Sequence, residues 1–316
     1  MCNFVAKFEN RKMKDSIKRE QSELAHFAEH ENLRTKCKVK IQTSMKLNNG
    51  IEIPQMGAGT WTLRGETARK NVRMALEAGF RHIDTAQMYE NEAEVGQGIA
   101  DSNVPRNEVF LTTKIVPNVM RQGQQAVRQS IDESLAKLKM DYIDLLLIHW
   151  PVKDCVRHTW QVMEDFVRQG KVRSIGVSNF NPHHLDELLT YAEIRPVINQ
   201  IEVHPYMSQE VNIAYNRQLG IQVEGWGPFG QGDIDVVGHP LLQSLATKYQ
   251  KTASQIVLRW IVQRDLITIP RCRPKHFAEN LDVMHFTLSD EDMQAVNSLN
   301  QNMRSSDMND PENFPW

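Results

Sequence analysis

The segment Ile143-Asp144-Leu145-Leu146-Leu147-Ile148-His149 is an apolar run with the length of a buried β-strand. Before it, from Val127 to Leu138, apolar residues recur every three or four positions, as on one face of a helix. A second apolar run, Val109–Ile115, precedes that helix. The order strand, helix, strand predicts parallel strands joined by a helical crossover.

The same alternation continues in both directions along the chain. Short β-type runs occur at Gln55–Thr60, His82–Thr85, Val109–Ile115, Ile143–His149, Ser174–Ser178, Val197–Glu202, Gln222–Trp226 and Thr268–Pro270. Eight strands separated by helical segments predict a closed (β/α)₈ barrel. The alternative is an open, doubly wound sheet, which is weakened because Gly57-Ala58-Gly59-Thr60-Trp61 does not complete a GxGxxG motif.

Both ends of the chain add short segments to this pattern. Leu47–Ile53 alternates around Asn49-Gly50, which predicts a β-hairpin able to plug the bottom of the barrel. At the other end, Ser305–Trp316 is polar and loop-like, and two alternatives remain open for it. It either folds back over the rim of a pocket or is a frayed tail.

The 316 residues include 37 Lys and Arg, 39 Asp and Glu, and 41% hydrophobic residues, as in ordinary globular proteins. The near-neutral charge argues against a nucleic-acid binder that relies on bulk electrostatics. No apolar run approaches the roughly 18–20 residues that cross a bilayer. We therefore expect neither nucleic acid nor membrane as a partner.

Residues 1–44 differ from the rest of the chain. They carry 10 basic and 6 acidic residues and contain no Gly or Pro, which indicates an N-terminal extension, disordered or partly helical, before a domain spanning 45–316. The extension lacks the apolar core of a secretory signal. The four cysteines form no CxxC pair, so we expect no metal site and a reducing, cytoplasmic location.

Polar or aromatic side chains stand at or near the ends of successive predicted strands. They are Asp84, Lys114, His149, Ser178, Asn179, Gln200 and Trp226. Singly, each has an ordinary structural explanation, such as a turn, a core histidine or packing. In a barrel, however, the carboxyl ends of all strands meet at one mouth, where active sites lie.

A proton-transfer site follows from three of these residues together with Tyr89, five positions beyond Asp84. A tyrosine with its ordinary pKa near 10 is a weak acid at neutral pH. A neighbouring Lys114 would lower the pKa of Tyr89, and Asp84 would hold that lysine charged. His149 could orient a substrate oxygen. Proton donation to a carbonyl, without a metal or a nucleophile, suggests hydride reduction by a nicotinamide.

Three longer motifs carry a family resemblance. Gly79–Glu92 (GFRHIDTAQMYENE), Leu147–Pro151 (LIHWP) and Gly170–Phe180 (GKVRSIGVSNF) occur in this order. Together they resemble the aldo-keto reductase family, in particular its bacterial type with 2,5-diketo-D-gluconate reductases, from about Met45 to Asn300.

The resemblance implies a (β/α)₈ barrel and assigns roles to individual residues. The catalytic residues would be Asp84, Tyr89, Lys114 and His149, and Trp61 and Trp150 would line the substrate pocket with Tyr89 and His149. The residues implied to bind the cofactor are Ser178, Asn179, Gln200, Trp226, Gly227, Phe229, Arg271, Cys272, Arg273, His276, Glu279 and Asn280.

The chain departs from the family pattern at the last of these segments. Ile269-Pro270-Arg271-Cys272-Arg273-Pro274-Lys275-His276 replaces the usual Ile-Pro-Lys-Ser sequence and is one residue shorter up to Glu279-Asn280. Its basic side chains still suit a 2′-phosphate. We therefore expect NADPH as the cofactor, with NADH as the alternative.

The expected function is the NADPH-dependent reduction of an aldehyde or ketone to an alcohol by a monomer, with Tyr89 as general acid. Short loops, such as that after His149, favour small polar carbonyls such as keto sugars, diketogluconate-type acids or methylglyoxal. The alternative is a nicotinamide-binding regulatory or scaffold subunit with little turnover, suggested by the extension at residues 1–44.

Overall fold

The computed structural model describes residues 43–314. The predicted extension at 1–44 lies outside this range except for Thr43 and Ser44, and so does Trp316. The first described strand, β1, begins at Ser44, next to the predicted domain boundary.

Eight parallel strands pair in chain order around the molecule. They are β3 (Ala58–Gly59), β4 (His82–Asp84), β5 (Phe110–Ile115), β6 (Ile143–Ile148), β7 (Val172–Ser178), β8 (Ile198–Glu202), β9 (Gln222–Trp226) and β10 (Ile267–Thr268). The amides of Gly57 and Gly59 donate to the carbonyls of Thr268 and Pro270, at 2.8 and 2.9 Å, and thereby join the first strand to the last. The predicted (β/α)₈ barrel is confirmed, and the open-sheet alternative is wrong.

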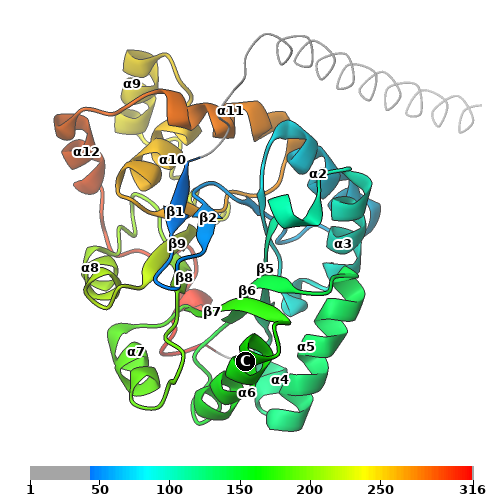
Figure 1. Ribbon diagram of the computed structural model, residues 1–316. Coiled ribbons are helices and arrows are strands. Elements are labelled where there is room, and N and C mark those ends of the chain that lie inside the picture. The colour runs from blue at the N-terminus through cyan, green and yellow to red at the C-terminus, as the bar shows by residue number, and fades with distance from the viewer. Residues whose placement is uncertain (1–42, 315–316) are drawn as a thin grey trace, which may run out of the picture. The chain divides into compact units, whose positions relative to one another are not determined.

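Helices surround the strands on the outside (Figure 1). They are α2 (Gly65–Ala78), α3 (Glu92–Asp101), α4 (Pro117–Met120), α5 (Gln124–Leu138), α6 (Val156–Arg168), α7 (Pro182–Leu189), α8 (Glu210–Gln218), α9 (Pro240–Tyr249), α10 (Ala253–Gln263), α11 (Phe277–Asp282) and α12 (Asp290–Asn297). The buried face of α8 consists of Asn212, Ile213 and Asn216, two of which are polar, so this helix has no clear apolar stripe in the sequence. None of the helices among residues 43–314 is long and apolar enough to span a membrane.

An apolar layer closes one end of the barrel. The hairpin of β1 (Ser44–Lys46) and β2 (Glu52–Pro54) buries Leu47 and Ile53 there. These two side chains share a cluster with residues of the barrel strands, namely Phe110, Leu145, Leu147, Ile198 and Ile267. The predicted plug at this end of the barrel is therefore confirmed.

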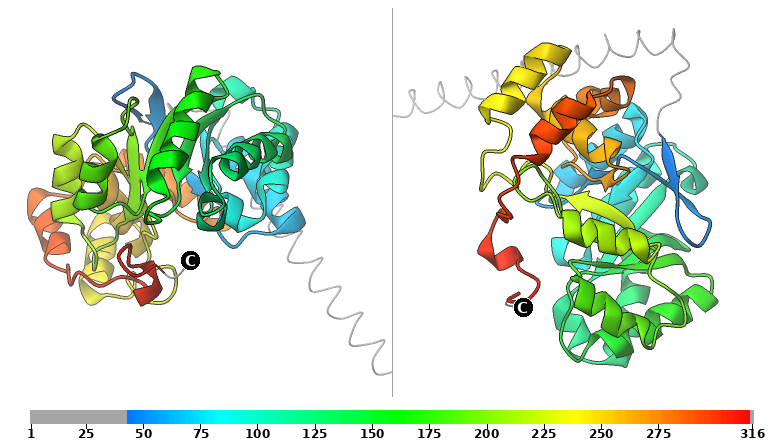
Figure 2. Two further views of the ribbon diagram at one scale, coloured as in Figure 1. Left: turned by 90° about the horizontal axis from the view of Figure 1, so that it is seen from below. Right: turned by 90° about the vertical axis from the view of Figure 1, so that its left-hand side faces the viewer.

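The segment after α12 returns toward the barrel. It runs from the helix to the described end of the chain as an irregular stretch with one short 3₁₀ turn, η5 (Asp307–Asn309) (Figure 2). The amides of Gln301 and Met303 both donate to the carbonyl of Tyr206, at 3.1 and 3.0 Å, and so tie this stretch to the loop after β8.

Candidate active site

A cavity of about 530 Å³ opens at the carboxyl ends of the strands. Most of the residues singled out in the sequence line it: Trp61, Asp84, Tyr89, His149, Trp150, Ser178, Asn179, Gln200, Trp226, Gly227, Phe229, Arg271, Arg273, His276 and Asn280. Strand ends as far apart in sequence as Gly59 and Thr268 therefore converge on one site, as parallel strands of a barrel require.

Lys114 is fully buried at the base of this cavity. Its Nζ donates to both carboxylate oxygens of Asp84, at 2.7 and 2.8 Å, and to the carbonyl of Thr85 at 2.8 Å. A fourth, longer contact of 3.4 Å reaches the hydroxyl of Tyr89. Burial alone would lower the pKa of Lys114, but the attraction of Asp84 and Tyr89 raises it, so the ammonium stays charged.

Tyr89 lies at the end of a 3₁₀ turn, η1 (Gln87–Tyr89), and its ring packs against Trp61 at 4.9 Å between centroids. Gln87 secures this turn, because its Oε1 accepts from the amide of Val116 and its Nε2 donates to Ser134 Oγ. Burial raises the pKa of Tyr89, while Lys114 acts to lower it. Lys114 therefore acts on this pKa in the expected direction, but desolvation outweighs it and the net pKa is raised.

His149 follows β6, and its ring lies edge-on to Tyr89, 5.7 Å away between centroids. Burial, followed by repulsion from Lys114, lowers the pKa of His149 well below its ordinary value. The imidazole is neutral at physiological pH and can donate a hydrogen bond through one ring nitrogen.

Ser178, Asn179, Gln200 and Trp226 form a connected wall of the cavity. Asn179 adopts a left-handed conformation with φ of 63° at the end of β7, which asparagine tolerates better than most residues. Its Nδ2 donates to the carbonyl of His149 at 3.0 Å, and its Oδ1 accepts from Trp226 Nε1 at 2.9 Å. These bonds fix the indole ring at the cavity wall.

The basic segment after β10 lies at a further part of the cavity. Arg271, Arg273 and His276 line it, and burial followed by repulsion from Arg273 lowers the pKa of Arg271. Two predicted cofactor ligands do not line the cavity. Cys272 is buried with its Sγ donating to the carbonyl of Asn71 at 3.3 Å, and Glu279 pairs with His276 at 3.1 Å.

The sequence analysis missed two features of the site. Glu224 on β9 is completely buried directly beneath it, yet this strand showed only its final Trp226 as a candidate. Phe314 stacks on Trp150 with 3.7 Å between ring centroids and a 10° interplanar angle, and it lines the cavity with Met308. Alternation along β9 would have placed Glu224 and Trp226 on the same inward face. The fold-back alternative for the C-terminal segment is confirmed as far as Phe314.

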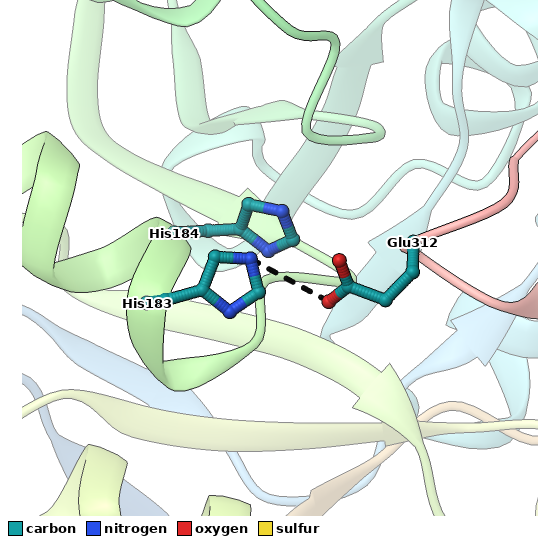
Figure 3. A group of neighbouring side chains, drawn as sticks. All are labelled: His183, His184 and Glu312. Atoms are coloured by element: carbon teal, nitrogen blue, oxygen red, sulfur yellow. Dashed lines mark ion pairs between the residues drawn. The ribbon is translucent and has the colours of Figure 1, made fainter.

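A side-chain cluster holds this returning segment against α7 (Figure 3). Glu312 lies 3.5 Å from His183 Nε2 and accepts a hydrogen bond from the side chain of Asn181. These two contacts join residues about 130 positions apart. Although His183, His184 and Glu312 could be metal ligands, His184 Nδ1 already accepts from the Asn181 amide at 3.1 Å. We therefore assign the cluster a structural role.

Comparisons with known proteins agree with this geometry. Residues 55–301 match the aldo/keto reductase family. The chain is 41% identical over 266 residues to the glyoxal reductase of Bacillus subtilis, covering 84% of this chain and 95% of the relative. It is 40% identical over 275 residues to a methylglyoxal reductase of Escherichia coli, covering 86% and 98%.

A solved structure shares the fold as well. The Bombyx mori aldo-keto reductase, crystallised in complex with NADP, superposes with a TM-score of 0.80 at 39% identity, covering 87% of this chain and 98% of that chain. Barrel and site together define an oxidoreductase that uses NADP(H) to reduce carbonyl compounds. The chain belongs to the aldo/keto reductase family.

Proposed function

We propose that this cavity reduces small polar aldehydes and ketones, with Tyr89 as the proton donor. The observation that carries the proposal is the buried Lys114, held by both oxygens of Asp84 and 3.4 Å from the Tyr89 hydroxyl. Burying an unpaired lysine would lower the stability of the fold. The contact of this lysine with a phenol is the arrangement that proton donation requires.

The donor set of the cavity fits a nicotinamide dinucleotide phosphate. Ser178, Asn179 and Gln200 supply hydroxyl and amide groups for a carboxamide, and Trp226 supplies an aromatic face. Gly227 has a φ of 63° and lines the cavity with Phe229, so this turn suits the pyrophosphate. Farther along, Arg271, Arg273, His276 and Asn280 suit the adenosine and its 2′-phosphate. When bound, the nicotinamide supplies the hydride.

The residues of the chain donate the proton, stabilise the resulting charge and orient the carbonyl. The Tyr89 hydroxyl donates its proton to the carbonyl oxygen as negative charge develops there. Lys114 stabilises the phenolate that is left, and Asp84 holds the ammonium in place. The neutral His149 donates a hydrogen bond to the same oxygen and orients the carbonyl.

The walls of the cavity suggest which carbonyls enter. Trp61, Trp150, Met308 and Phe314 narrow the mouth with apolar surface, while the base is polar. A short substrate with a second oxygen, such as a dicarbonyl or a keto acid, fits this combination. The curated names of the two relatives, glyoxal reductase and methylglyoxal reductase, support the same substrate class.

The test is the Tyr89→Phe variant assayed with NADPH and methylglyoxal by the loss of absorbance at 340 nm. We expect kcat to fall by at least about 10²-fold because general acid catalysis contributes about that much, while NADPH binding persists in a fluorescence titration. Tyr215→Phe, which changes a tyrosine bonded to Asp186 outside the cavity, is the control. Reduction by Tyr89→Phe at the parental rate would overturn the assignment of the acid.

We propose further that the enzyme works as a cytoplasmic monomer and that residues 1–42 are dispensable for reduction. Within residues 43–314, the residues that line the cavity all lie beyond residue 58. Light scattering after size-exclusion chromatography tests the monomer. To test whether the N-terminal residues are dispensable, kcat/KM is measured for a chain that begins at Thr43. We expect the parental value, and a large loss would contradict the proposal.

A further inference from the structure

A polar layer lies inside the barrel between the apolar plug and the active site. It consists of His82 on β4, Thr112 on β5 and Glu224 on β9, all completely buried. The interior of such barrels is normally filled by bulky branched apolar side chains. A histidine and a glutamate at this depth therefore require a reason other than packing.

Glu224 is connected to the proposed catalytic residue Asp84 through the side chain of Gln200. Its Oε2 accepts a hydrogen bond of 3.1 Å from Gln200 Nε2, and the same nitrogen donates to Asp84 Oδ2 at 2.8 Å. The amide of Gln200 thus bridges the two carboxyl groups. Since both bonds use its nitrogen, its oxygen is left for other partners.

The second oxygen of Glu224 has no hydrogen-bond partner within residues 43–314. It lies 3.6 Å from His82 Nε2, which in turn lies 3.1 Å from Thr112 Oγ1. Burial lowers the pKa of His82 to about 3, so its ring is neutral and offers no charge to compensate a carboxylate.

The charge state of Glu224 follows from these surroundings. Burial, followed by repulsion from Asp84, raises the pKa of Glu224 to about 8. At neutral pH the group is an uncharged carboxylic acid that can donate from Oε1 toward His82. Above this pH it becomes a second negative charge beside Asp84, in a region that water does not reach.

We propose that Glu224 is a positioning residue for carbonyl reduction: as a neutral carboxyl it holds the Gln200 amide against Asp84, and its ionisation weakens Tyr89 as a proton donor. The proposal rests on the proposed function of Tyr89 and Gln200. It assigns to Glu224 no contact with substrate or cofactor.

The groups that face Glu224 across the barrel explain why its ionisation would weaken Tyr89 as a proton donor. They are His82 and Asp84 on β4 and Lys114 on β5, with Tyr89 above them, while its strand neighbours β8 and β10 present the uncharged Gln200 and Ile267. A new negative charge here makes the Tyr89 phenolate less stable and offsets part of the effect of Lys114.

Two variants separate the effect of the Glu224 hydrogen bond on the position of Gln200 from the effect of the Glu224 charge on Tyr89. Glu224→Gln keeps the acceptor for Gln200 but cannot ionise. Glu224→Met fills the same space and removes the acceptor. The matched control is Glu92→Gln, because Glu92 is also a buried acid whose pKa is raised by burial, but it binds Thr113 and Ser134 on the helix side of β5.

The measurements are kcat/KM for methylglyoxal from pH 6 to 10 and the NADPH dissociation constant by fluorescence. For Glu224→Gln we expect parental kcat/KM within about 2-fold at pH 6.5, and an alkaline decline that moves up by at least one pH unit. For Glu224→Met we expect NADPH to bind about 5-fold more weakly at pH 6.5. Glu92→Gln should keep the parental profile.

An alkaline profile of Glu224→Gln that superposes on the parent would overturn the electrostatic part, and unchanged NADPH affinity in Glu224→Met would overturn the positioning part. If Glu224→Met does not fold, the NADPH affinity of Glu224→Ala tests whether Glu224 positions Gln200. Failure of the Tyr89 assignment is seen separately, since Tyr89→Phe would then retain activity while the NADPH titrations of the Glu224 variants remain interpretable.

Discussion

At the scale of the single residue, Lys114 shows how a buried charge is tolerated. Three of its contacts, two to Asp84 and one to the carbonyl of Thr85, are 2.8 Å or shorter and replace the water that burial removes. Removing one partner of such a pair leaves the other as an uncompensated buried charge.

We therefore expect Lys114→Met to lower the free energy of unfolding by about 3–5 kcal/mol, because Asp84 loses its cation. Reduction should also be lost, since nothing then stabilises the Tyr89 phenolate. Urea denaturation and the 340 nm assay measure the two effects.

The control for this variant is Lys171→Met, which breaks an exposed pair with Asp132. It should cost no more than about 1 kcal/mol because exposed salt bridges contribute little. Equal destabilisation by the two variants would contradict the account of Lys114.

At this scale, the sequence predicted which side chains contact one another, but not the net direction in which the pKa of Tyr89 is shifted. The pairing of Asp84, Lys114 and Tyr89 could be predicted because each lies on or just after a strand end that faces the same mouth. The net direction of the Tyr89 pKa could not, since desolvation depends on the side chains packed around the ring, including Trp61.

At the scale of the element, the C-terminal segment decides the shape of the cavity mouth. Phe314 stacks on Trp150, Glu312 meets His183, and the amide of Ser305 donates to the buried Glu202 at 2.7 Å. Together with the bonds of Gln301 and Met303 to Tyr206, these contacts anchor the segment along its described length.

We expect Phe314→Ala to raise KM for methylglyoxal about 5-fold, with a smaller effect on kcat and none on NADPH affinity. The reason is the loss of an aromatic stack worth about 0.5–1.5 kcal/mol beyond its buried area. Steady-state kinetics and a fluorescence titration measure this.

Asp307→Asn changes an exposed residue of the same segment and serves as its control. A parental KM in Phe314→Ala would show that the stack does not shape the substrate site.

At the scale of the whole molecule, the buried Glu224 couples stability to pH. Its pKa is raised to about 8 in the folded protein, against an ordinary value of 4.5. Between these values the folded state holds a proton that the unfolded state has lost, so stability falls as pH rises. His82, whose pKa is lowered to about 3, has the opposite effect, but only below its ordinary value of 6.5.

Between pH 6.5 and 8, therefore, Glu224 contributes to the pH dependence of the free energy of unfolding and His82 does not. We expect the parent to lose about 2 kcal/mol more stability than Glu224→Gln across it, since each pH unit corresponds to about 1.4 kcal/mol per proton. Urea denaturation of both proteins at pH 6.5 and 8.0 measures this difference. Equal losses would mean that Glu224 is already ionised in the folded protein at pH 6.5.

By itself, the sequence determined the barrel, its plug and the set of residues at its mouth. Apolar runs and helical periodicity are local signals, and parallel strands carry their ends to one face regardless of what lies between them. Only the tertiary structure decided the burial of Cys272 away from the cavity, the link from Glu224 to Asp84 through Gln200, and the stack of Phe314 on Trp150. These depend on which distant side chains meet and how far they exclude water, which no local pattern encodes.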